Sequence, residues 1–113
     1  IIIYHNPKCS KSRKVLEIIN NKHIQPKVIL YLVNKLNKAE IKKIIRALGL
    51  NIRDILRKDE DEYKKNKIKN DNLSDDKLIE LLIKFPKLLQ RPIVIKNNKA
   101  VIGRPPENIL TLL

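Results

Sequence analysis

The chain has 113 residues, enough for a hydrophobic core without metal or disulfide support, and we expect one domain over residues 1–113. No apolar run approaches the about 20 residues of a membrane-spanning helix, so we expect no membrane partner. The net charge is +13, but the lysines are scattered among acidic residues and the aromatics are only three tyrosines and one phenylalanine. This distribution argues against nucleic acid as the main partner, because such surfaces cluster cations with stacking aromatics.

The first third of the sequence predicts a strand, a helix and a second strand. Residues 1–4 form a β-branched run that is typical of a buried strand, and the Asn6-Pro7 pair ends it. Apolar residues then recur at helical spacing up to about residue 20, so we expect a helix that begins between Cys9 and Ser12. Residues 28–32 predict the second strand.

The middle of the chain predicts helices separated by a polar segment. Asn37 and Glu40 have the spacing of a capping box, and the helix that follows should end at Gly49. Residues 52–56 predict a short apolar turn. Residues 58–72 read as a surface excursion with a helical turn at 61–65, and Ser74 begins another helix that ends before Pro86.

The last third predicts a hairpin followed by a helix. Residues 93–95 and 100–102 are strand-like, and Asn97-Asn98 between them is a two-residue turn signal. A last helix should begin near Pro105-Pro106 and extend to residue 113. This order of elements predicts an α/β protein with a thioredoxin-like, four-stranded mixed sheet flanked by helices and with a helical insertion.

Cys9 is the only cysteine, so these residues hold no internal disulfide, which is typical of a reducing, cytoplasmic environment. It is expected at a helix N-terminus, where the helix dipole lowers a thiol pKa by up to about 1.5 units. An ordinary thiol, with a pKa of about 8.5, needs a fall of about two units to be mostly thiolate at neutral pH. His5, Ser12 and a nearby arginine would have to supply the rest. Two interpretations stay open, an inert buried cysteine or a reactive thiolate.

The arginines form the second candidate feature. Arginine is the rarer cation here, and its planar fork suits tetrahedral oxyanions. With the two-asparagine turn as the centre, the hairpin register places Arg91 directly opposite Arg104. Like charges in this position are destabilising, so either both side chains are splayed into solvent or an anion lies between them. Arg57 is a third candidate, although taken alone it reads as a surface arginine.

Several other chemistries are excluded. A phosphate-cradling loop needs more glycines than Gly49 and Gly103. A phosphatase-type loop needs an arginine six residues after the cysteine, whereas Arg13 follows by four. Cys9 and His5 are too few for a metal site, and His23 is distant in sequence, so we expect no metal.

Four segments in the same order, YHNPKCSKSR, LRKDEDEYKK, QRPIVI and AVIGRPPENIL, together resemble the glutaredoxin-coupled arsenate reductase family. The resemblance runs from Tyr4 to the C-terminus and implies a thioredoxin-like fold. This chain departs from the family's usual Gly-Thr after the cysteine, having Ser10-Lys11 there. That difference changes the backbone freedom and the charge beside the nucleophile.

The resemblance also implies a set of site residues. Cys9 would attack arsenate, and three arginines would bind and neutralise the oxyanion: Arg57, Arg91 and Arg104. The residues expected to stabilise the thiolate are His5, Asn6 and Ser12. No bound cofactor is implied; glutathione would be the cosubstrate and glutaredoxin the protein partner.

The residues around the cysteine bear on the mechanism and on the alternatives. Ser12 stands where a thiol-disulfide oxidoreductase has its second cysteine, so an oxidised Cys9 needs an external thiol. One alternative is a regulator of the related RNA-polymerase-binding Spx branch, whose members usually sense redox state with paired cysteines. Another is a thiol-dependent reductase of the same fold with a different substrate.

Overall fold

The structure is a computed structural model that describes residues 1–69 and 72–113. The contacts divide the chain into two compact units. The sheet unit comprises Ile1–Asn34 and Arg91–Leu113, and the helical unit comprises Lys35–Gln90. The predicted surface excursion at 58–72 falls in the helical unit, and its residues 70 and 71 lie outside the described part.

The sheet unit contains a four-stranded mixed sheet in the order β2-β1-β3-β4. Its strands and helices are β1 (Ile2–Tyr4), α1 (Ser10–Asn21), β2 (Lys27–Ile29), β3 (Ile93–Lys96), β4 (Lys99–Ile102) and the 3₁₀ helix η3 (Pro106–Thr111). Strand β1 is parallel to β2 and antiparallel to β3, which in turn is antiparallel to β4. The predicted α/β class and mixed four-stranded sheet are therefore confirmed.

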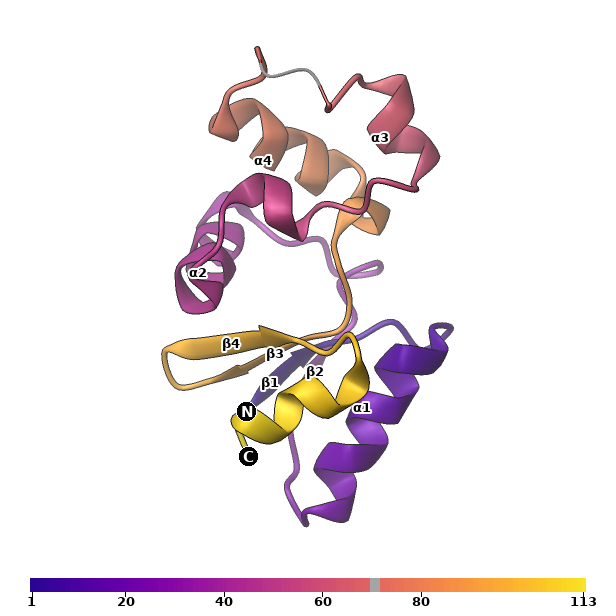
Figure 1. The fold of residues 1–113 in the computed structure, drawn as a ribbon, viewed down its shortest axis with the longest axis vertical. Coiled ribbons are helices and arrows are strands. Elements are labelled where there is room, and N and C mark those ends of the chain that lie inside the picture. Colours follow the sequence, from indigo (N-terminus) through magenta and orange to yellow (C-terminus); the bar gives the residue numbers. More distant parts are fainter. Residues whose placement is uncertain (70–71) are drawn as a thin grey trace. The chain divides into compact units, whose positions relative to one another are not determined.

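Helices α1 and η3 lie on the same side of this sheet (Figure 1). The core between them consists of five fully buried residues from the sheet and the two helices, namely Ile3, Val15, Ile19, Val94 and Ile109. Val15 and Ile19 are one helical turn apart, so the apolar face of α1 that the sequence pattern predicted is the face that packs here.

The hairpin has the predicted register. Ile93 pairs with Ile102, and Lys96 pairs with Lys99 around the two-asparagine turn. Asn97 takes a left-handed conformation with a φ of 58°, as a tight hairpin turn requires. The pairing continues past the strand ends, because Gly103 N–H donates to Pro92 O at 2.8 Å.

Two elements of the sheet unit differ from their predictions. Strand β2 ends at Ile29 rather than Leu32, because the Leu30 carbonyl accepts hydrogen bonds from the N–H groups of Val33 and Asn34 and forms a turn. The last helix is a 3₁₀ helix, in which Asn108 N–H donates to Pro105 O three residues back. Hydrogen bonds that reach back three residues instead of four make this short element a 3₁₀ helix and not an α-helix.

The helical unit follows the predicted order closely. Its elements are α2 (Lys38–Leu48), the 3₁₀ helix η1 (Ile52–Ile55), α3 (Asp61–Lys65), α4 (Asp75–Lys84) and the 3₁₀ helix η2 (Pro86–Leu88). Asn37 and Glu40 form the predicted capping box, and Gly49 ends α2 with a φ of 68°. Ser74 caps α4 by accepting a hydrogen bond from Lys77 N–H.

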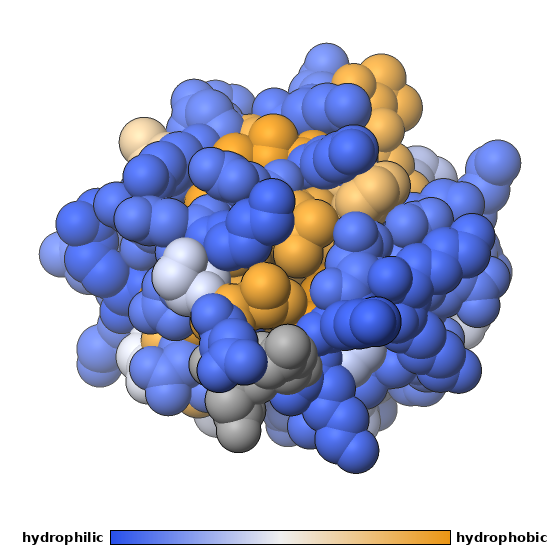
Figure 2. Space-filling view, turned by 90° about the horizontal axis from the view of Figure 1, so that it is seen from above, coloured by the Kyte–Doolittle hydropathy of each residue, from blue (hydrophilic) through white to orange (hydrophobic). Residues whose placement is uncertain are grey.

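Charged side chains dominate the surface. Figure 2 shows one face of the protein, on which hydrophilic side chains surround a smaller area of apolar atoms.

Among the residues that the structure describes, only His5 and Ser12 are both polar and buried. Burying polar groups is unfavourable unless they are hydrogen-bonded, so these two residues are candidates for a role other than packing in the core.

Gly103 allows the hairpin to approach α1 closely. A methyl group at this position would lie 2.7 Å from Val15 Cγ2 and 3.0 Å from Pro92 Cγ. We therefore expect Gly103→Ala to lower the free energy of unfolding by about 1–3 kcal/mol, measured by urea denaturation. The same change in a Val15→Ala background should be less destabilising, because the closest clashing atom is gone. An equal effect in both backgrounds would contradict the steric explanation.

Candidate active site

Cys9 occupies the junction between β1 and α1. It is the N-cap residue of α1, and its carbonyl accepts the helical hydrogen bond from Arg13 N–H at 3.0 Å. Its own N–H donates to Asn6 O at 3.0 Å, which closes the loop after β1. The residue is 9% exposed. The thiol therefore lies at the predicted helix N-terminus, in a fixed loop and with slight access to solvent.

The surroundings of Cys9 lower its pKa. Burial is the largest single influence and raises the pKa, since it disfavours the thiolate. The backbone N–H groups of Ser12 and Lys11, the charge of Arg91 and the guanidinium of Arg104 all lower the pKa, and together they outweigh burial. The sulfur makes no capping hydrogen bond, so the N–H groups act on it as the positive end of the helix dipole. The environment thus favours the nucleophilic form of the thiol.

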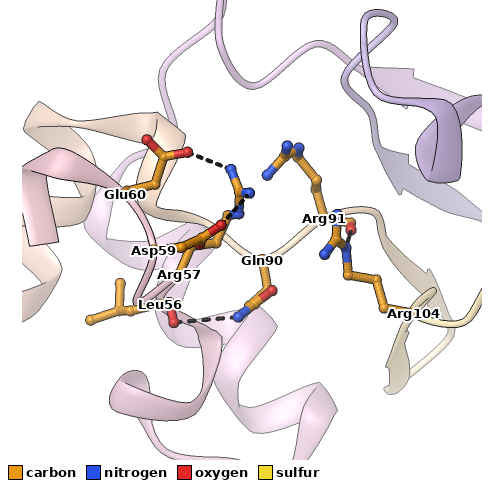
Figure 3. A network of polar contacts seen from close by, with 7 residues as sticks. All are labelled: Leu56, Arg57, Asp59, Glu60, Gln90, Arg91 and Arg104. Carbon is orange, nitrogen blue, oxygen red and sulfur yellow. Dashed lines mark hydrogen bonds and ion pairs between the residues drawn. The ribbon is translucent and has the colours of Figure 1, made fainter.

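Arg91 and Arg104 come together at the open end of the hairpin, as the register predicted. Arg104 Nε–H donates to the backbone oxygen of Arg91 at 2.8 Å (Figure 3). Nε and Nη1 of Arg91 are buried and have no hydrogen-bond acceptor among the described residues. Each of these arginines precedes a cis proline, Pro92 and Pro105. The splayed, solvated arrangement does not hold for Arg91, whose buried donors suit an anion.

His5 and Ser12 form a buried pair beneath the loop. His5 Nδ1 and Ser12 Oγ share a hydrogen bond of 2.6 Å, and Ser12 Oγ also accepts from Asn6 N–H at 3.0 Å. Burial, with the nearby charge of Arg13 second, lowers the pKa of His5, so its imidazole is neutral at neutral pH. A neutral imidazole adds no positive charge beside the thiol. In this geometry the pair fixes the loop shape, and Ser12 reaches Cys9 through its N–H rather than its hydroxyl.

Two residues that contribute to the site around Cys9 were not identified from the sequence. Lys11 acts on Cys9 through its backbone N–H, which no side-chain motif reveals. Arg13 Nη1 donates to Pro7 O at 2.9 Å and so ties α1 to the loop that precedes it. The position of Arg13 in the basic stretch around Cys9 could have indicated this contact. In the sequence analysis, however, Arg13 served only to exclude a phosphatase-type loop.

Arg57 belongs to the helical unit, whereas Cys9, Arg91 and Arg104 belong to the sheet unit. Its guanidinium forms ion pairs with Glu60 through Nη1 and with Asp59 through Nη2 (Figure 3). Its backbone N–H donates to Leu88 O at 2.7 Å. Arg57 is thus a mostly buried cation with two anionic partners, and its predicted role in oxyanion binding stays a prediction.

The described residues contain no group of three or more His, Cys, Asp or Glu side chains able to hold a metal ion. None of the described helices has the length and apolar character that crossing a membrane requires.

Residues 4–112 match the ArsC family. An arsenate reductase of Haemophilus influenzae is 42% identical over 114 residues, covering 100% of this chain and 98% of that protein. The uncharacterized protein YfgD of Escherichia coli (strain K12) is 42% identical over 98% of this chain and 94% of its own length. The solved structure of an arsenate reductase from Vibrio cholerae has 45% identity and a TM-score of 0.97, covering 99% of this chain and 96% of that one.

Ser12→Ala is expected to destabilise the protein by about 1–3 kcal/mol, because it leaves buried groups without a hydrogen-bond partner. Ser10→Ala is the matched control, since Ser10 is exposed and its change should stay within about 0.5 kcal/mol. Urea denaturation of both variants measures the difference. Equal stabilities for the two variants would contradict a structural role for the His5–Ser12 pair.

Arg91→Gln is expected to raise the pKa of Cys9, because the thiolate loses a favourable charge interaction. The rate of alkylation by iodoacetamide as a function of pH reports the thiolate fraction, and its midpoint should move to higher pH. Lys11→Gln removes a charge nearer in sequence but keeps the backbone N–H, so it should move the midpoint less. An unmoved midpoint in Arg91→Gln would refute the electrostatic role of this arginine.

Proposed function

We propose, on the premise that this chain belongs to the ArsC family, that it reduces arsenate to arsenite with Cys9 as the nucleophile. One observation carries the proposal: a thiol of lowered pKa lies under the influence of Arg91, whose buried donors have no acceptor among the described residues. Such a pairing suits a nucleophile that must meet a tetrahedral oxyanion.

The first step forms a sulfur–arsenic bond. The Cys9 thiolate attacks arsenic(V), and one arsenate oxygen leaves as water after it takes up protons. No electrons are transferred here, so arsenic stays pentavalent. Negative charge on the remaining oxygens is stabilised by guanidinium groups, and we assign this role to Arg91 and Arg104 because both also act on the sulfur.

The second step needs a thiol from outside these residues, because Cys9 is the only cysteine among them. An external thiol attacks the Cys9 adduct and a sulfur–sulfur bond forms. The sulfur–arsenic bond breaks, its electron pair stays on arsenic, which becomes trivalent, and the thiol proton goes to an arsenite oxygen. Arsenite leaves, and a further thiol releases Cys9 from the mixed disulfide. The sum is one arsenate and two thiols converted to one arsenite, one disulfide and one water.

We assign the external thiols to glutathione and glutaredoxin, and the third oxyanion contact to Arg57, on the resemblance of the sequence segments. The same resemblance assigns His5, Asn6 and Ser12 to the support of the thiolate. The hydrogen bonds of these three residues favour support through the shape of the loop and the placement of N–H groups, rather than through charge.

Purified protein supplied with glutathione and glutaredoxin is expected to reduce arsenate, and Cys9→Ser should reduce turnover to the buffer level. Ser10→Ala should keep turnover, since this exposed hydroxyl has no assigned role. Arsenite is measured directly, and omission of glutaredoxin tests the assigned reductant. Turnover by the unmutated protein that does not exceed the buffer would reject arsenate as substrate, and unchanged turnover in Cys9→Ser would reject the nucleophile.

A further inference from the structure

Arg57 is paired with two carboxylates in the structure. An arginine that binds an oxyanion is expected to have the N–H groups of its guanidinium available for that anion. Nη1 donates to Glu60 Oε1, and Nη2 donates to Asp59 Oδ2 at 3.3 Å (Figure 3). Counting formal charges, the three side chains sum to −1. An incoming anion therefore meets a cation that its own neighbours have already overcompensated.

The two carboxylates differ in their surroundings. The side chain of Glu60 is 24% exposed and that of Asp59 is 75% exposed, against 14% for Arg57. Exposed ion pairs contribute little because water screens them, whereas a pair that is largely shielded from water is stronger. Glu60 is therefore the partner that determines how available Arg57 is to an anion.

The backbone holds the pair in place on both sides. Arg57 N–H donates to Leu88 O at 2.7 Å, and two residues away on each segment Gln90 N–H donates to Ile55 O at 2.8 Å. The Glu60 carbonyl accepts from Tyr63 N–H at 3.1 Å as α3 begins. Because the main chain is fixed at both residues, the contact is released by rotation of side chains and needs no unfolding of the loop.

We propose that Glu60 is a built-in competitor for the oxyanion at Arg57 and so sets the affinity of the protein for its anionic substrate. The inference rests on the proposed function, in which Arg57 contacts the oxyanion. Glu60 acts through Arg57 and is a positioning residue. Substrate binding at Arg57 must replace or share the Glu60 contact, which weakens binding of every tetrahedral oxyanion.

Glu60→Gln is expected to lower KM for arsenate by about fivefold or more, in the range typical of coupling between sites, with kcat changed less than KM. Glu62→Gln is the matched control. It removes the same charge two residues away, and its carboxylate accepts a hydrogen bond from Asn66 rather than from Arg57. Glu60→Asp keeps the charge and should return KM toward the value of the unmutated protein.

A double-mutant cycle with Arg57→Gln tests the route of the effect. In the Arg57→Gln background, Glu60→Gln should no longer change KM, because the cation that it occupies is gone. The proposal is overturned by an unchanged or higher KM in Glu60→Gln, by an equal fall in Glu62→Gln, or by an effect that persists without Arg57.

Direct binding separates this inference from the proposed function. Calorimetric titration with arsenate and with sulfate measures anion affinity without turnover, and Glu60→Gln should bind both more tightly than the unmutated protein. Absent turnover together with tighter anion binding would reject the reductase activity and keep the role of Glu60. Turnover together with unchanged anion affinity in Glu60→Gln would keep the reductase activity and reject the role of Glu60. A lack of anion binding by both proteins would also reject the role of Glu60.

Discussion

The pairing of β1 with β3 is the constraint on which the candidate site in the sheet unit depends. Tyr4 pairs with Ile93, so residues from opposite ends of the sequence become neighbours in one sheet. Five residues after Tyr4 comes Cys9, and two residues before Ile93 comes Arg91. The electrostatic influence of Arg91 on the thiol is a consequence of this register. A shift by one residue would turn every side chain of the strand to the other face and separate the two groups.

The same unit uses opposing influences to make its thiol reactive. Cys9 is largely buried, and burial disfavours its thiolate form. The N–H groups of the helix and two guanidinium groups outweigh this effect and lower the pKa of the thiol. A fully solvated cysteine would gain little from these charges, because water screens them. Partial burial therefore strengthens the interaction of the thiolate with the favourable charges, provided that a rigid scaffold holds these charges in place. Gly103 belongs to that scaffold, because it leaves room for the hairpin to approach Val15 closely.

The helical unit presents a different balance. Arg57 lies in a shielded position where each of its terminal nitrogens is paired with a different carboxylate. In the sheet unit the buried donors of Arg91 have no acceptor among the described residues. The two arginines were assigned one task from sequence resemblance, yet one holds its charge in internal ion pairs and the other does not. Under the proposed function, that contrast is the reason for proposing that Glu60, as well as the arginines, sets the substrate affinity.

Several elements were predictable from the sequence because their signals are local. The capping box at Asn37, the turn at Asn97, the helix after Cys9 and the register that faces Arg91 with Arg104 all follow from residues close in the chain, where propensity and hydrogen bonding act directly. The early end of β2 and the 3₁₀ form of η3, which depend on competing backbone hydrogen bonds, were not predicted.

The contacts of the site side chains were not predictable in this way, because they arise only in the folded chain. Ser12 reads in the sequence as a thiolate partner, but its hydroxyl binds His5 and only its N–H acts on Cys9, because the loop and the first turn of α1 fix the two groups differently. Arg57 reads as a surface arginine or an anion ligand, and the shielding of its contact with Glu60 depends on how the surrounding helical unit packs. Charge and residue type are written in the sequence, whereas burial and distance, which set the strength of every electrostatic interaction, arise only on folding.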